Sequence, residues 1–293
     1  MRLIPMLVLF SLLASPQIAR SAEPTPMPLA KVGPWEMNYD TDSCHLLAAF
    51  GTGDQAVSMR ITRLAPGSSF DLTLYGNRVG TSDLRVDASI GFGDRPAEIK
   101  RTALSGTIGS ERKLPMLIIT SLRIDGNIGF TKGSSPIPEV TPAEEAATTS
   151  ITVKLPSRKQ FRFETGSLAV PFKALRNCTA DLVKSWGFDP EVEARLIKRP
   201  ETTGRPENWL TSNDFPRGPN QRGQSGALTF RLDVQETGRV SGCRVLFRTD
   251  PDDFADLTCK LLMKRAAMSP ALDEHGKPVK SFYIRKVQWL AAP

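Results

Sequence analysis

The hydrophobic positions between Trp35 and Glu164 recur with a period of two residues, which is typical of strands with one buried face. Short alternating segments rich in β-branched and aromatic residues occupy 57–61, 70–74, 84–87, 117–119, 151–155 and 161–163. Glycine and asparagine turn residues separate these segments, and both residue types accept positive φ. The pattern predicts a mainly antiparallel β domain, folded as a sandwich or an open barrel.

Residues 131–149 interrupt this pattern with a stretch rich in Pro, Ser, Thr and Glu. Alternating segments resume after it, so a boundary between domains is not expected here. The composition predicts an exposed loop within the β domain.

From Pro171 the apolar positions change to helical spacing, through Phe172, Leu175, Cys178 and Leu182. Proline suits the first turn of a helix, and a glycine at position 187 is a typical stop. This helix is expected to close the β domain. A second helix is expected at 190–199, followed by a polar linker.

The last 80 residues predict the order strand, strand, helix, strand. Apolar and polar residues alternate over 228–234, a turn follows at 236–238, and a second strand is expected at 240–247, with Cys243, Val245 and Phe247 on the core face. A helix begins near Asp252, because acidic residues open it and an apolar stripe follows. Residues 281–289 read as the last strand.

These elements place the whole chain in the α+β class. The boundaries that follow from them are a signal peptide at 1–22, a β-rich domain with a terminal helix at 23–187, a helix and linker at 188–212, and a small C-terminal domain at 213–293.

The N-terminus has the form of a signal peptide. Basic Arg2 precedes an apolar run at 5–14 that is too short to span a bilayer, and small residues at Ala19 and Ser21 fit a cleavage site near 19–22. No later stretch is apolar enough for a second span. We therefore expect export to the periplasm, with no membrane span once the signal is removed.

Four cysteines fit an oxidising compartment, because an even count after export usually means disulfides. Cys44 and Cys178 should join the two ends of the β domain, a bridge worth about 2–4 kcal/mol. Cys243, on a strand face, and Cys259, on a helix margin, should form the second bridge, worth roughly 3 kcal/mol. The spacing lacks a zinc signature, so no metal is expected.

Several motifs of the C-terminal domain keep their order and spacing: Phe215-Pro216, the strand 226–234, Thr237-Gly238-Arg239-Val240, Arg265 near the helix end, Ser269-Pro270-Ala271, and Gly276-Lys277-Pro278-Val279. Over residues 213–289 this pattern resembles the C-terminal domain of the energy transducer TonB. The resemblance implies a sheet that binds a short segment of an outer-membrane receptor as an added strand, a mode in which main-chain hydrogen bonds supply affinity.

The candidate edge under this resemblance is 282–288, and the candidate partner-binding residues are Phe215, Pro216, Phe282, Tyr283, Ile284 and Arg285. Three features depart from the family: a cleavable signal, the lack of a long Pro-rich spacer, and a β domain where the spacer would lie. The sequence therefore favours a periplasmic, non-catalytic binding or adaptor protein that engages a cell-envelope protein through its TonB-like domain.

Other chemistry is weakly represented. His45 and Cys44 are neighbours on a strand and should point to opposite faces, which disfavours a Cys-His catalytic pair. The acidic pairs 252–253 and 273–274 suit a helix start and a turn. The net charge of +7 is scattered among acids, so nucleic acid is not expected as a partner. The prediction is no enzyme and no cofactor.

Two alternatives stay open. One is a membrane-anchored, TonB-type transducer that keeps its N-terminal helix and takes part in outer-membrane transport. The other is an exported enzyme or small-ligand carrier with its site in the N-terminal β domain, where glycine-rich turns cluster.

Overall fold

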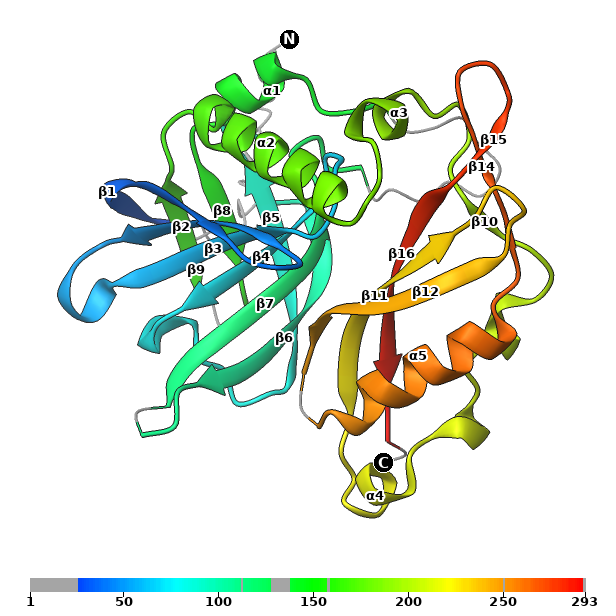
Figure 1. The fold of residues 1–293 in the computed structure, drawn as a ribbon. Helices are drawn as coiled ribbons and strands as arrows, with labels where there is room; N and C mark the ends of the chain where they lie inside the picture. The colour runs from blue at the N-terminus through cyan, green and yellow to red at the C-terminus, as the bar shows by residue number, and fades with distance from the viewer. Residues whose placement is uncertain (1–25, 112, 128–137, 157–158, 250, 292–293) are drawn as a thin grey trace, which may run out of the picture.

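The protein is a mixed α+β chain, built mostly from strands with a few helices (Figure 1). This computed structural model describes residues 26–111, 113–127, 138–156, 159–249 and 251–291. The predicted signal peptide and its cleavage site lie outside the described residues.

Nine strands of the N-terminal part close into a barrel in the order β1-β2-β3-β4-β7-β6-β5-β8-β9. Their bounds are β1 Met27–Tyr39, β2 Cys44–Phe50, β3 Val57–Arg63, β4 Phe70–Tyr75, β5 Arg85–Phe92, β6 Ile99–Ile108, β7 Leu114–Leu122, β8 Ile151–Lys154 and β9 Gln160–Glu164. The expected sandwich or open barrel is therefore corrected to a closed barrel.

The first strand makes this closure possible, because it pairs with a different neighbour at each end. Its start, 27–30, runs parallel to 161–164 of β9, and its later part runs antiparallel to β2. Within the ladder with β2 the register shifts between Val32 and Glu36, around Pro34 and Gly33, whose φ of 75° lies in the left-handed region that favours glycine. A bulge of this kind bends a strand.

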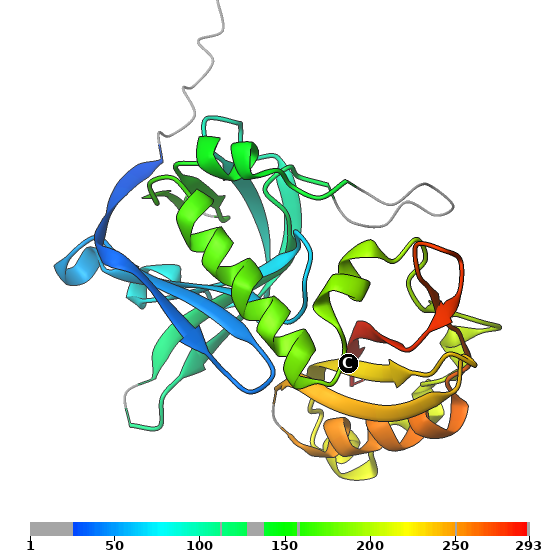
Figure 2. The ribbon, with the colours of Figure 1, turned by 45° about the horizontal axis from the view of Figure 1, so that its top comes forward.

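The inner face of the barrel is a packed aromatic and aliphatic core. Phe50 meets Phe163 at 5.2 Å between ring centroids, and Phe70 meets Phe172 at 5.5 Å. Phe172 belongs to helix α2 (Ala169–Ser185), whose apolar face covers one end of the barrel (Figure 2). The change from period two to helical spacing thus correctly predicted the closing helix.

Part of the expected exposed loop is folded. Residues 142–147 form helix α1 (Pro142–Ala147), which begins with a capping box between Thr141 and Glu144. Glu145 is only 1% exposed and pairs with Arg176 of α2. The expectation of an exposed loop is wrong for residues 142–147, because a local sequence pattern does not show which segments become buried in the folded protein. Residues 131–137 lie outside the described residues.

Helix α3 (Pro190–Arg195) ends four residues before the expected Arg199, where Leu196 leaves helical geometry at ψ 122°. The segment expected as a linker is tied to the C-terminal part, since β10 (Glu201–Thr202) pairs with β13 (Met268–Ser269). Further short elements are η1 Gly53–Gln55, η2 Asn77–Val79, η3 Pro206–Asn208, η4 Ser212–Asp214, α4 Arg217–Gln221, β14 Ala271–Leu272 and β15 Pro278–Val279.

The C-terminal part is a three-stranded antiparallel sheet in the order β12-β11-β16, from β11 Gly226–Val234, β12 Val240–Arg248 and β16 Ser281–Trp289. Helix α5 (Asp253–Arg265) packs on the face that points away from the barrel (Figures 1 and 2). The strand, strand, helix, strand order matches the sequence pattern.

One side chain of β12 points to the opposite face of the sheet from the one predicted. Phe247 is 38% exposed, whereas its neighbour Leu246 is buried. The pairing with β11 jumps from Val245 to Phe247, so Leu246 is an extra residue and the alternation reverses there. Cys243 and Val245, before the bulge, pack against the core as expected.

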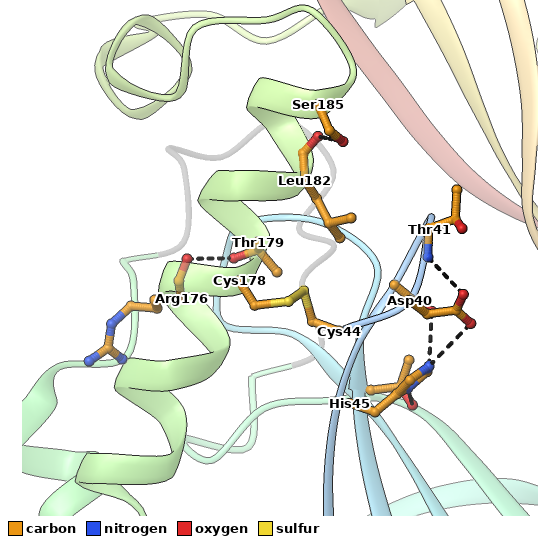
Figure 3. The surroundings of a disulfide bond; sticks show 11 residues. Asp40, Thr41, Cys44, His45, Arg176, Cys178, Thr179, Leu182 and Ser185 are labelled. Atoms are coloured by element: carbon orange, nitrogen blue, oxygen red, sulfur yellow. Dashed lines mark hydrogen bonds and ion pairs between the residues drawn. A yellow bond between two sulfur atoms is a disulfide. The ribbon is translucent and has the colours of Figure 1, made fainter. Parts of the chain in front are cut away.

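Both expected disulfides are present. Cys44 and Cys178 are 6.0 Å apart at Cα and join β2 to α2, while Cys243 and Cys259 are 5.5 Å apart and join β12 to α5. Figure 3 shows Cys44 turned toward the helix and His45 turned away from it. Two bridges are consistent with an exported protein. None of the helices in the described part of the chain combines the length and apolar character needed to cross a bilayer.

Candidate functional site

The last strand, β16, is an edge of the C-terminal sheet. It pairs with β11 along its whole length, from Ser281 opposite Val234 to Trp289 opposite Gly226. Within the described ranges, no other strand pairs with its second side. The predicted edge at 282–288 is therefore an edge strand in the structure.

The backbone groups that β16 offers to this side follow from the hydrogen bonds of β11. The Thr249 N–H donates to the Ala227 carbonyl at 2.9 Å, so the odd-numbered residues of β11 point toward β12. Antiparallel ladders alternate, which leaves the even-numbered residues of β11 to bond with β16. Their partners in β16 are odd-numbered, so the N–H and C=O groups of the even-numbered residues point outward: Phe282, Ile284, Lys286 and Gln288.

A groove of about 550 Å³ runs beside this edge. One wall is β16 itself, through Tyr283, Arg285 and Val287, and the opposite wall is the segment 206–215, through Trp209 and Leu210. An added strand needs a free row of backbone groups and room for alternate side chains. The edge and the groove supply both.

The segment opposite β16 is held by a charge-assisted clamp. Both Arg265 Nη atoms donate to the Asp214 carboxylate, at 2.7 and 2.9 Å, and Nη1 also donates to the Trp209 carbonyl at 3.1 Å. The Thr211 N–H and hydroxyl donate to the same carboxylate. The Arg265 guanidinium, with these Thr211 bonds, holds the pKa of Asp214 far below its usual value.

Aromatic rings form the base of the groove. Phe215 meets the ring of Phe254 at 5.4 Å and that of Trp289 at 5.8 Å, and the Trp289 indole donates to Thr258 Oγ1 at 3.0 Å. The predicted residue Phe215 therefore lies in the groove and anchors it to α5 at the same time.

Two more predicted residues, Tyr283 and Arg285, share the groove face of β16. The Arg285 guanidinium lies 5.4 Å from the centre of the Tyr283 ring and donates to its hydroxyl at 2.6 Å. The pair gives this wall an aromatic surface with a cationic border.

The remaining predicted residues lie elsewhere. Phe282 is 7% exposed and is packed between Trp186 and Phe188, at 5.4 Å from each ring, while Ile284 lies beside this cluster. Their side chains point toward the barrel because neighbours on a strand alternate, so they are taken up by the contact between the two parts of the chain. Pro216 precedes α4 and does not line the groove.

Sequence reasoning missed the wall at 209–212. Trp209 in this wall is a buried packing residue, at 7% exposure. The wall is held by an ion pair between Asp214 and Arg265. Both residues are visible in the sequence, but only the fold shows that they lie together.

No group of three or more His, Cys, Asp and Glu side chains within the described ranges is placed to hold a metal ion. His45 is held by Ser43 and Thr62, each at 2.9 Å, and burial lowers its pKa. A scan against protein-family models, a search of curated proteins and a search of solved structures each found no match to this chain.

Proposed function

We propose that this chain is an exported, non-catalytic binding protein of the bacterial periplasm, which captures an extended segment of a cell-envelope protein as a fourth strand beside β16. The observation that carries the proposal is the outer edge of β16 beside a groove lined by Tyr283 and Trp209. The likeness of residues 213–289 to the TonB domain supports the same mode of binding.

Strand addition suits this surface on energetic grounds. An edge-bound segment satisfies the four outward-pointing residues of β16 through main-chain bonds, each worth about 0.5–1.5 kcal/mol net. Side chains on one face of the added strand would enter the groove, where aromatic rings favour an apolar or aromatic residue. The sheet keeps its covered faces, since α5 lies on one side and the barrel on the other.

The test is photo-crosslinking in the periplasm with the full chain. A photoreactive phenylalanine analogue at Tyr283 should form an adduct with one envelope protein, and the crosslinked residues should fall within one extended segment. The matched control carries the analogue at Val170, which is 79% exposed on α2, and should give no such adduct.

A synthetic peptide of the crosslinked segment then tests the mode. Two versions of the peptide are made, one with N-methyl groups on its odd-numbered residues and one with them on its even-numbered residues. In an added strand only every second N–H faces β16, so one version should lose binding and the other should keep it. Equal binding by both series, or equal adducts from position 283 and position 170, contradicts the proposal.

The anchored-transducer alternative is separated from this proposal by the mature N-terminus. Sequencing of the protein purified from cells should begin near Ala22 or Glu23. A start at Met1 in a membrane fraction supports the anchored form instead.

A further inference from the structure

A second cavity, of about 210 Å³, lies between the outer face of the barrel and the face of the C-terminal sheet opposite α5. Strands β2, β3, β4, β6 and β7 supply its barrel wall, and β11, β12 and β16 supply the other. The cavity is separate from the groove beside β16, which lies on the α5 side of that strand. Neither the strand-binding proposal nor the fold gives it a role.

One cation in this cavity has no ionic partner. Arg60 points outward from β3, with its guanidinium carbon 5.5 Å from the centre of the Tyr75 ring. Its Nε atom is fully buried and makes no hydrogen bond, and no carboxylate in the described part of the chain pairs with the guanidinium. Arg60 is only partly buried, but its Nε donor is cut off from water without a hydrogen bond, so an anion that reaches it gains an interaction that the chain does not supply.

Two carboxylates also face the cavity, and within the described residues neither of them pairs with Arg60. Asp71 accepts from Lys286 at 2.6 Å and from the Ser121 N–H at 2.9 Å. Asp40 accepts from the Thr41 N–H at 2.7 Å and lies 3.9 Å from His45. Asp71 is thus paired with Lys286, and Asp40, whose side chain is 62% exposed, makes no ion pair with Arg60 within the described residues.

The rest of the lining combines hydroxyls with an apolar surface. Besides Ser43, the hydroxyl-bearing residues are the threonines Thr62, Thr73, Thr102, Thr120, Thr229 and Thr249. Leu104 and Ile118 on the barrel wall oppose Leu246 and Phe247 on the sheet wall. A few polar groups within an apolar lining are typical of small-molecule sites. At about 30 Å³ per water, the volume corresponds to roughly seven waters, or a ligand of about ten heavy atoms.

We propose that this cavity binds a small monocarboxylate with an apolar body. The carboxylate accepts hydrogen bonds from the Arg60 guanidinium, whose planar fork matches a carboxylate in two-point contact. The threonine hydroxyls complete the polar shell, and the apolar body lies between Ile118 and Phe247. The ligand contacts both parts of the chain, so its binding also fixes their relative position.

The experiment is a calorimetric titration of the full mature chain with benzoate, and with benzamide as the uncharged analogue of the same shape. Benzoate should bind, and benzamide should bind at least about tenfold more weakly, since it lacks the charge. Arg60→Gln should weaken benzoate binding by at least about tenfold, whereas Arg222→Gln, an exposed arginine outside the cavity, should leave it unchanged.

An NMR measurement on the native chain keeps the test independent of how the variants fold. Benzoate should shift the methyl resonances of Thr73 and Thr229, which lie on opposite walls, and should leave that of Thr211 unmoved. No benzoate binding, equal binding of benzoate and benzamide, or shifts at Thr211 without shifts at Thr73 would each overturn the proposal.

Discussion

The barrel and the C-terminal sheet use the same antiparallel pairing but treat their edges in opposite ways. Every barrel strand has two neighbours, because β1 closes the seam onto β9. The C-terminal sheet leaves the outer side of β16 without a strand among the described residues. Closure removes edges and open sheets expose them. The smaller part of the molecule therefore has the edge at which we propose strand capture.

Each of these two parts of the molecule contains one of the two disulfides. The bridge from Cys44 to Cys178 spans 134 residues and ties the covering helix to the barrel, whereas that from Cys243 to Cys259 spans only 16. Long loops lose more unfolded-state freedom when they are closed. The barrel therefore depends more on its bridge than the C-terminal sheet does.

The largest expected effect comes from removing these bridges. The double change Cys44→Ala with Cys178→Ala should cost about 5 kcal/mol in the chain-entropy model, above the typical range of about 2–4 kcal/mol because the closed loop is long, and the same change at Cys243 and Cys259 about 3 kcal/mol. Urea unfolding at neutral pH measures both losses. A larger loss from the shorter loop would contradict the comparison.

The next effect concerns the contact that joins the two parts. Phe282→Ala leaves a cavity between Trp186 and Phe188 and should cost about 3 kcal/mol of unfolding free energy. Leu290→Ala, which removes a side chain that is 52% exposed, is the matched control and should cost little. Equal losses in the two variants would show that the Phe282 contact does not hold the parts together.

A smaller effect is expected at the free edge. Gln288→Pro removes an outward N–H from β16 but no hydrogen bond of the sheet, so stability should change little. Affinity for the crosslinked peptide should fall about tenfold, the value of one lost hydrogen bond. Gln288→Thr keeps the N–H and should bind normally; unchanged binding by the proline variant would argue against strand addition.

The smallest effect lies in the wall opposite β16. Because the folded-state pKa of Asp214 is lowered, its contribution to stability is fully present above the unfolded value of about 3.9 and is lost as the pH falls through the folded pKa. Asp214→Asn should weaken peptide binding by no more than about fivefold, since the pair is partly exposed.

The readout for this carboxylate is a pH series of urea unfolding for both proteins. The stability difference between native protein and Asp214→Asn should be greatest at neutral pH and should shrink below about pH 4. A stability difference that grows as the pH is lowered would contradict the expected direction of the effect.

Local pattern predicted much of the fold. The last strand was expected at 281–289 and occupies those residues, with its buried side chains at the two ends, Ser281 and Phe282 at one and Trp289 at the other. Two barrel strands, β1 and β6, were missed, and β2 was expected only as a strand through Cys44 and His45, without bounds. Pro28 and Pro34 interrupt the strand pattern of β1, because proline is unusual inside a strand. In β6 only Ala103 of the ten residues is buried, so apolar and polar positions do not alternate clearly.

The parts of the sites that were not predicted depend on distant segments. The groove wall at 209–212 acquires its position from Arg265, more than 50 residues later. In the alternating segment 57–61, Arg60 falls on the face opposite the buried Met59 and Ile61, but the outer face of a strand is normally solvated. Only the packing of the C-terminal sheet against that face turns it into a cavity.

Hydrogen exchange along β16 tests the central claim most directly. In the free chain, the outward amides of Ile284, Lys286 and Gln288 should exchange quickly, while those of Tyr283 and Arg285, bonded to β11, should be protected. Addition of the crosslinked peptide should protect the outward set. Outward amides that are already protected in the free chain, or that stay unprotected in the complex, would contradict strand addition at this edge.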